Sequence, residues 1–181
     1  MANNVSCRQI TADETVPLRH SVLWPNEHVS HVLLPDDATG WHYGAFVDSG
    51  STSASAPVAV ISLFAEACPI DKTQAHALDY QGHTQNNGAA AGRDIRFRKF
   101  ACDPAYQGRG IGTALLRHAV SVAGTDPELA GVLIWCDARE ATRGWYERRG
   151  MDAFGVTFFK GPVEYVRMKM DIAIDIQGIP N

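Results

Sequence analysis

Residues 106–113 read Tyr-Gln-Gly-Arg-Gly-Ile-Gly-Thr and lie between an apolar run at residues 97–102 and an amphipathic run at 114–122. This order predicts a strand, a glycine loop and a helix. Glycines at alternate positions let the backbone approach a ligand, because no Cβ stands in the way. The start of the helix adds unpaired N–H groups at the positive end of its dipole. The stretch therefore predicts a phosphate-binding loop.

Two common phosphate loops do not fit this stretch. The Rossmann fingerprint needs its third glycine one position later, where Thr113 stands, and residues 103–107 separate the strand from the glycines. The P-loop needs Gly-Lys followed by Ser or Thr, which the stretch lacks. A nicotinamide-dependent oxidoreductase is therefore supported by the glycines alone, and an NAD(P)H-binding measurement would test it.

The glycine stretch resembles the acyl-CoA pyrophosphate loop of the GNAT (Gcn5-related) N-acetyltransferases. The family pattern is Gln/Arg-x-x-Gly-x-Gly/Ala, and Gln107, Gly110 and Gly112 meet it. The resemblance implies acetyl-CoA as cosubstrate. The backbone of the strand end would bind its pantetheine arm and the loop its pyrophosphate, and the residues concerned are Phe100, Ala101, Cys102, Gln107, Gly108, Arg109, Gly110, Ile111, Gly112 and Thr113.

A second resemblance lies downstream of the loop. An apolar run at 132–136 predicts a buried strand, and residues 138–151 predict a helix that ends at a glycine. The family's aromatic-Tyr pair and its Gly-aromatic/Met pair are met by Trp145-Tyr146 and Gly150-Met151. Asp137, which precedes the expected helix, has the residue type of an N-cap.

The resemblance implies an α/β (α+β) GNAT fold, a mixed sheet of about six to seven strands flanked by helices. The resemblance covers roughly residues 41–171. We expect one domain over 1–181 with a flexible insertion at 67–94, where the periodic pattern of strands and helices disappears. A capping-box sequence at 11–14 predicts a helix toward Trp24. Further strands are predicted at residues 5–10, 41–47, 57–66, 96–102, 153–160 and 164–171.

Transfer of an acetyl group to an amine needs a proton acceptor for the ammonium and a proton donor for the leaving thiolate. By resemblance, Tyr146 is the general acid; a core tyrosine beside Trp145 is the alternative. Histone-type members carry a catalytic Glu about where Arg96 stands, so this chain has no equivalent of that base at this position. Glu66 and His42 are the candidate bases, with Asp103 or a water relay as alternatives.

Alternation along the strand at 96–102 places Arg96 and Arg98 on one face and Lys99 on the other. The two arginines could bind a carboxylate on the substrate or lie at a solvent edge, and the sequence leaves both open.

Composition limits the class of protein. The chain has 181 residues, 45% of them hydrophobic, which is enough for one domain with a real core. Its net charge of −4 argues against general nucleic-acid affinity. The cysteines have no CxxC spacing and predict free thiols, with no metal site, and no run of about 18 apolar residues predicts a membrane span. These features lead us to expect a cytoplasmic protein.

The sequence therefore predicts an acyl-CoA-dependent N-acetyltransferase that acts by direct transfer on the primary amine of a small molecule. The alternative is a catalytically silent acyl-CoA-binding module with a protein partner, because no base is obvious. A homodimer through apolar residues at 24–34 stays open.

Overall fold

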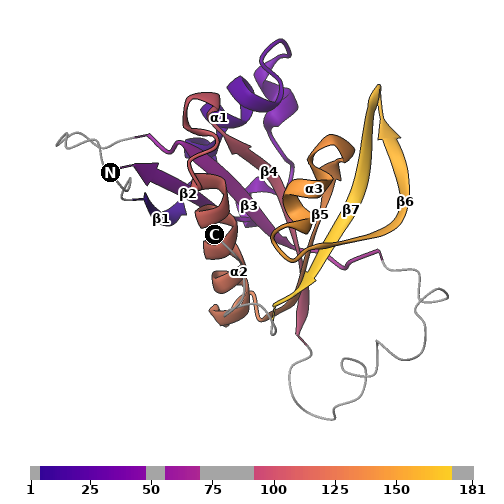
Figure 1. Ribbon diagram of the computed structural model, residues 1–181. Helices are drawn as coiled ribbons and strands as arrows, with labels where there is room; N and C mark the ends of the chain where they lie inside the picture. The colour runs from indigo at the N-terminus through magenta and orange to yellow at the C-terminus, as the bar shows by residue number, and fades with distance from the viewer. Residues whose placement is uncertain (1–4, 48–55, 70–91, 173–181) are drawn as a thin grey trace. The chain divides into compact units, whose positions relative to one another are not determined.

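The computed structural model describes residues 5–47, 56–69 and 92–172. These ranges contain a seven-stranded mixed sheet, as predicted, with strand order β1-β2-β3-β4-β5-β7-β6 (Figure 1). The pairs β1–β2, β2–β3, β5–β7 and β6–β7 are antiparallel, and β4 with β5 is parallel. The strands are β1 (Val5–Ile10), β2 (Trp41–Val47), β3 (Ala59–Ala65), β4 (Arg93–Cys102), β5 (Gly131–Arg139), β6 (Asp152–Lys160) and β7 (Val163–Asp171).

In the described part of the chain, three α-helices and four short 3-10 turns connect the strands. The helices are α1 (Ala12–Leu23), α2 (Ile111–Thr125) and α3 (Arg143–Glu147). The turns are η1 (Val29–Val32), η2 (Asp37–Thr39), η3 (Pro104–Tyr106) and η4 (Glu140–Thr142). No helix within the described ranges is long and apolar enough to cross a membrane.

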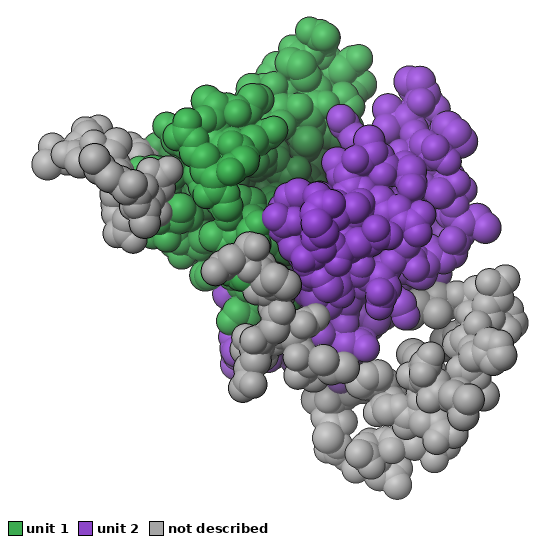
Figure 2. Space-filling model, viewed as in Figure 1, with its two compact units in different colours: residues 1–64, 97–121, 181 green, residues 65–96, 122–180 purple. Residues whose placement is uncertain are grey.

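The chain divides into two compact units, coloured separately in Figure 2. The described part of the first comprises residues 5–47, 56–64 and 97–121, and that of the second comprises 65–69, 92–96 and 122–172. Strand β4 therefore contributes its first residues to the second unit and its last residues to the first. The single domain expected over 1–181 stays a prediction.

In the first unit, helix α1 begins where its capping box predicts. The Thr11 amide donates to the Glu14 carboxylate at 2.7 Å, and the Glu14 amide donates back to the Thr11 hydroxyl at 3.3 Å. Helix α1 packs on an apolar cluster whose buried members are Ile10, Phe46, Val60 and Ala101. Helix α2 lies against the opposite face of β2. The ring centres of its His118 and of Tyr43 are 5.2 Å apart, whereas Arg19 of α1 contacts His42. Tyr43 and His42 are neighbours in the strand, so their side chains point to opposite faces.

In the second unit, β5 and β7 bury alternate residues. Ile134, Cys136 and Ala138 are buried on β5, as are Val166, Met168 and Met170 on the antiparallel β7. The residues between them are only partly buried or exposed, apart from Trp135. This alternation leaves one half-open sheet face, which carries the charged and aromatic side chains described below.

Three expectations about secondary structure were wrong in detail. Strand β4 begins at Arg93, so the insertion expected at 67–94 is at least two residues too long, and residues 70–91 lie outside the described part of the chain. The helix expected at 138–151 is the five-residue α3, because β5 continues to Arg139 and η4 follows it. Asp137 is consequently a residue of β5 and not a helix N-cap.

Candidate functional site

The glycine loop has the backbone that its sequence predicts. Gly108 and Gly110 have φ angles of +73° and +79°, which side-chain-bearing residues rarely adopt, and a Cβ on either would meet nothing within 4 Å. The loop is therefore open to a ligand at both positions. The first helical hydrogen bond follows at once, from the Ala114 amide to the Gly110 carbonyl at 2.9 Å. Such a helix start suits an anion, because the first N–H groups of a helix have no carbonyl partner within that helix.

The end of β4 is fixed next to this loop. The side chain of Gln107 donates to the Cys102 carbonyl at 2.9 Å, and the Asp103 amide donates to the Val58 carbonyl at 2.9 Å. Ala101 is buried, whereas Phe100 and Cys102 are half-buried. All ten residues predicted to bind acetyl-CoA therefore belong to one unit, on the β4 end, the loop and the first turn of α2.

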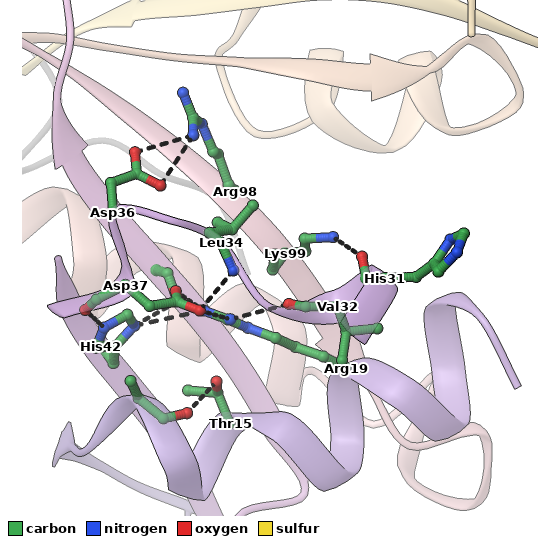
Figure 3. Close-up of polar contacts among 12 residues, drawn as sticks. Thr15, Arg19, His31, Val32, Leu34, Asp36, Asp37, His42, Arg98 and Lys99 are labelled. Carbon is green, nitrogen blue, oxygen red and sulfur yellow. Dashed lines mark hydrogen bonds and ion pairs between the residues drawn. The ribbon is translucent and has the colours of Figure 1, made fainter. Parts of the chain in front are cut away.

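Lys99 breaks the regular alternation of β4. Its φ angle is +53°, an uncommon conformation for a residue with a side chain. The Lys99 ammonium donates to the His31 carbonyl at 3.1 Å and lies 4.0 Å from the centre of the Trp24 ring. Arg98 pairs with Asp36 at 3.1 Å (Figure 3). Both side chains thus contact the segment that follows α1, so the expectation that Lys99 lies on the other face was wrong.

A buried arginine holds the segment that carries Asp36. Arg19 of α1 is fully buried and donates to the Val32 carbonyl at 3.2 Å and to both carboxylate oxygens of Asp37, at 2.8 and 3.0 Å (Figure 3). Burial raises the pKa of Asp37, but the hydrogen bonds from Arg19 and from the Leu34 amide outweigh it and leave the pKa below its ordinary value.

His42 completes this network. Its Nε2 lies 2.8 Å from the Asp37 carbonyl, which only accepts hydrogen bonds, so Nε2 carries the proton. Its Nδ1 then accepts from the Ser62 hydroxyl at 2.7 Å, and that hydroxyl accepts from Arg19 at 2.6 Å. His42 is 4% exposed and has both ring nitrogens engaged. This geometry favours a structural role over a base.

In the second unit, Glu66 and Asp137 are joined by one arginine. Arg96 donates to Glu66 at 2.6 Å and to Asp137 at 2.5 Å, with its guanidinium 4.5 Å from the centre of the Trp135 ring. Lys160 also donates to Asp137, at 2.7 Å. The predicted base Glu66 is therefore already paired, and Asp137 accepts hydrogen bonds from cations on two other strands, β4 and β6. Sequence reasoning missed this cluster because its members come from separate segments.

Tyr146 lies on α3 in the second unit and is 8% exposed. Burial, and secondarily the neighbouring Cys136 thiol, raise the pKa of its phenol well above the ordinary value. The Trp145 ring meets it edge-on, with the ring centres 4.9 Å apart. Tyr146 is therefore a protonated phenol at neutral pH.

Comparison with known proteins identifies the fold. A family model described as an acetyltransferase (GNAT) domain matches residues 74–150. Arabidopsis thaliana NAA60 in complex with acetyl-CoA superposes with a TM-score of 0.68 at 12% identity, over 94% of this chain and 99% of that one. The chain carries the GNAT fold. The resemblance to the GNAT N-acetyltransferases seen in the sequence is thereby confirmed.

Two further solved structures share the GNAT fold. FeeM, an N-acyl amino acid synthase from uncultured soil microbes, superposes with a TM-score of 0.63 at 12% identity over 95% of this chain and 93% of its own. An acyl-CoA N-acyltransferase from Pseudomonas aeruginosa gives 0.56 at 15% identity, over 92% and 98%. No curated protein matches this chain.

The roles of the individual site residues stay predictions, and these residues fall in both units. The residues predicted to bind the cofactor lie in the first unit, which also holds His42. Tyr146 and Glu66 belong to the second unit. Within residues 5–47, 56–69 and 92–172, no three His, Cys, Asp or Glu side chains are grouped so that they could hold a metal ion.

Proposed function

We propose that this chain is an N-acetyltransferase that moves an acetyl group from acetyl-CoA to the primary amine of a small molecule. The observation that carries the proposal is the glycine loop, where two residues at positive φ have open space in front of them at the start of a 15-residue helix. The GNAT family match and the NAA60 complex with acetyl-CoA support the same ligand. In the reaction, the amine nitrogen bonds to the thioester carbonyl carbon, the C–S bond breaks, and one amine proton ends on sulfur.

The chain's own residues would contribute mainly by binding and orienting. The N–H groups at Gly108, Gly110 and the first turn of α2 would hold the pyrophosphate. Backbone groups at Phe100 to Cys102 would align the pantetheine arm as an added strand does. Orientation of this kind can account for a large part of a bimolecular rate enhancement.

Tyr146 is proposed as the donor toward the leaving sulfur. A thiol has a pKa of about 8.5 and a phenol of about 10, so proton transfer to the thiolate is uphill and becomes more so as burial raises the phenol's pKa. A protonated Tyr146 would therefore act chiefly by donating a hydrogen bond as negative charge develops on sulfur.

Both candidate bases are engaged in other contacts. His42 is held in the Arg19 network and Glu66 is paired with Arg96, so deprotonation of the amine through water is favoured over either side chain. The same observation supports a second candidate function, a silent acyl-CoA-binding module with a protein partner. The homodimer through residues 24–34 also stays a prediction; Val29 and Leu33 there are 39% and 49% exposed.

The experiment that tests the loop is calorimetric titration of acetyl-CoA into the wild type and the Gly110→Glu variant. A glutamate at Gly110 would occupy the pyrophosphate position and repel it. Gly161→Glu is the matched control, because Gly161 also has positive φ (+58°) and open space but lies in the β6–β7 turn. Binding lost only in Gly110→Glu supports the proposal, and absence of binding to the wild type overturns it.

A further inference from the structure

Asp137 lies at the centre of three cations in the second unit. Its Oδ2 accepts from Arg96 and Lys160, and its Oδ1 faces the Arg167 Nε at 3.7 Å, which is too long for a hydrogen bond. With Glu66, which also pairs with Arg96, the cluster contains three cationic side chains and two carboxylates. It therefore carries one positive charge in excess, although the whole chain has a net charge of −4.

Register places this cluster on the half-open face of the sheet. Asp137 of β5 is directly opposite Arg167 of β7, and the side chain of Lys160 reaches Asp137 from β6. The aromatic ring of Phe158 lies under Arg167, at 4.8 Å, and that of Tyr165 under Lys160, at 4.7 Å. The two rings stack on each other with their centres 5.9 Å apart, so both cations rest on one aromatic support.

Arg167 has unused hydrogen-bonding capacity. A guanidinium has five N–H donors, yet within the described ranges that of Arg167 makes no hydrogen bond: it has the long contact to Asp137, the ring contact with Phe158 and an electrostatic interaction with Cys68. Its side chain is 31% exposed and that of Lys160 is 48% exposed, so a ligand can reach both. By contrast, Arg96 already donates to two carboxylates. The substrate-carboxylate role that the sequence left open for Arg96 therefore fits Arg167 and Lys160 better.

We propose that Arg167 and Lys160 bind a carboxylate carried by the acceptor, so that the acceptor amine belongs to an amino acid or a similar amino-carboxylate. This inference rests on the proposed function and names its substrate class. A planar carboxylate matches the guanidinium fork, and its single negative charge matches the single excess positive charge of the cluster.

The test measures binding without turnover. N-acetylamino acids and their carboxamides, covering small, aliphatic, aromatic, acidic and basic side chains, are titrated into the wild type and followed by ligand-observed NMR. At least one acid is expected to bind about ten- to a hundred-fold more tightly than its amide, the range of a charge-assisted hydrogen bond. The preference should fall below about threefold in Arg167→Gln and Lys160→Gln. It should be partly kept in Arg167→Lys, which retains the charge without the fork.

Lys169→Gln is the matched control, because Lys169 lies on the same face of β7 one register step away and contacts Phe154, not Asp137. Its acid-to-amide preference should equal that of the wild type. An equal loss in Lys169→Gln would indicate a general field effect and overturn the inference, as would a wild type that does not prefer acids. Failure to acetylate any amine in a separate assay would overturn the proposed function alone.

Discussion

Arg19 and Asp37 form a bidentate ion pair in which the arginine is fully buried and the carboxylate side chain is 13% exposed. The pair joins α1 to the segment that also presents Asp36 to Arg98 and the His31 carbonyl to Lys99. That segment is thereby connected to the part of β4 that precedes the predicted pantetheine residues.

Removal of Arg19 should destabilise the protein strongly. In Arg19→Met, Asp37 and Ser62 lose their buried donor, and breaking a buried pair costs about 3–5 kcal/mol of unfolding free energy. Urea denaturation followed by circular dichroism measures the change. Arg148→Met, at an exposed position that follows α3, is the control and should change stability by less than about 0.5 kcal/mol. Equal stability of Arg19→Met and the wild type would show that the network contributes nothing.

The same pair predicts an acid dependence of stability. The folded-state pKa of Asp37 is below its ordinary value of 3.8, so its stabilising contribution is complete above that pH and is lost as the pH falls through the folded pKa. Between about pH 4 and pH 2, the wild type should therefore lose more stability than Asp37→Asn does. Urea midpoints of both proteins across this range provide the measurement, and parallel curves would refute the assignment.

Lys99 allows a test of the irregular backbone of β4. Alanine would keep the unfavourable positive φ and lose the contacts to His31 and Trp24, whereas glycine would lose the contacts but adopt φ +53° readily. Affinity for acetyl-CoA should therefore fall by up to about tenfold in Lys99→Ala and less in Lys99→Gly. Calorimetric titration of both variants measures this order. The reverse order would mean that the backbone conformation at Lys99 does not support cosubstrate binding.

Local patterns in the sequence predicted much of the fold. Glycine spacing, the capping box and alternation identified the loop, α1 and the strands, since each depends on neighbours in the chain. The conformation of Lys99 was not predictable because strand alternation assumes a regular backbone. Burial of Arg19 was missed because arginine is ordinarily exposed, and only tertiary contacts with residues 32, 37 and 62 satisfy it.

The candidate site was predicted in part for the same reason. Its cofactor side is a contiguous motif, whereas the Asp137 cluster brings together residues 96, 160 and 167, which no local pattern connects. The short α3 was overestimated because residues 138–142 have helix-forming composition but continue β5 and form η4.

The pH profile of acetyl transfer should reflect the buried phenol. Because burial places the pKa of Tyr146 above its ordinary value of 10, the phenol stays protonated through pH 9. Ionisation of Tyr146 should therefore cause no decline in the wild-type acetylation rate between pH 7 and pH 9 at saturating acetyl-CoA. In that range, the pH profiles of the wild type and of Tyr146→Phe should have the same shape. A decline in that range present only in the wild type would mean that Tyr146 ionises there.

Acetyl transfer itself is measured as release of free thiol from acetyl-CoA in the presence of a panel of primary amines, for the wild type and Tyr146→Phe. We expect amine-dependent release by the wild type that falls by about a hundredfold or more in Tyr146→Phe, with acetyl-CoA affinity unchanged. If the wild type binds acetyl-CoA but releases no thiol with any amine, the acetyltransferase proposal is contradicted and the silent acyl-CoA-binding module is favoured.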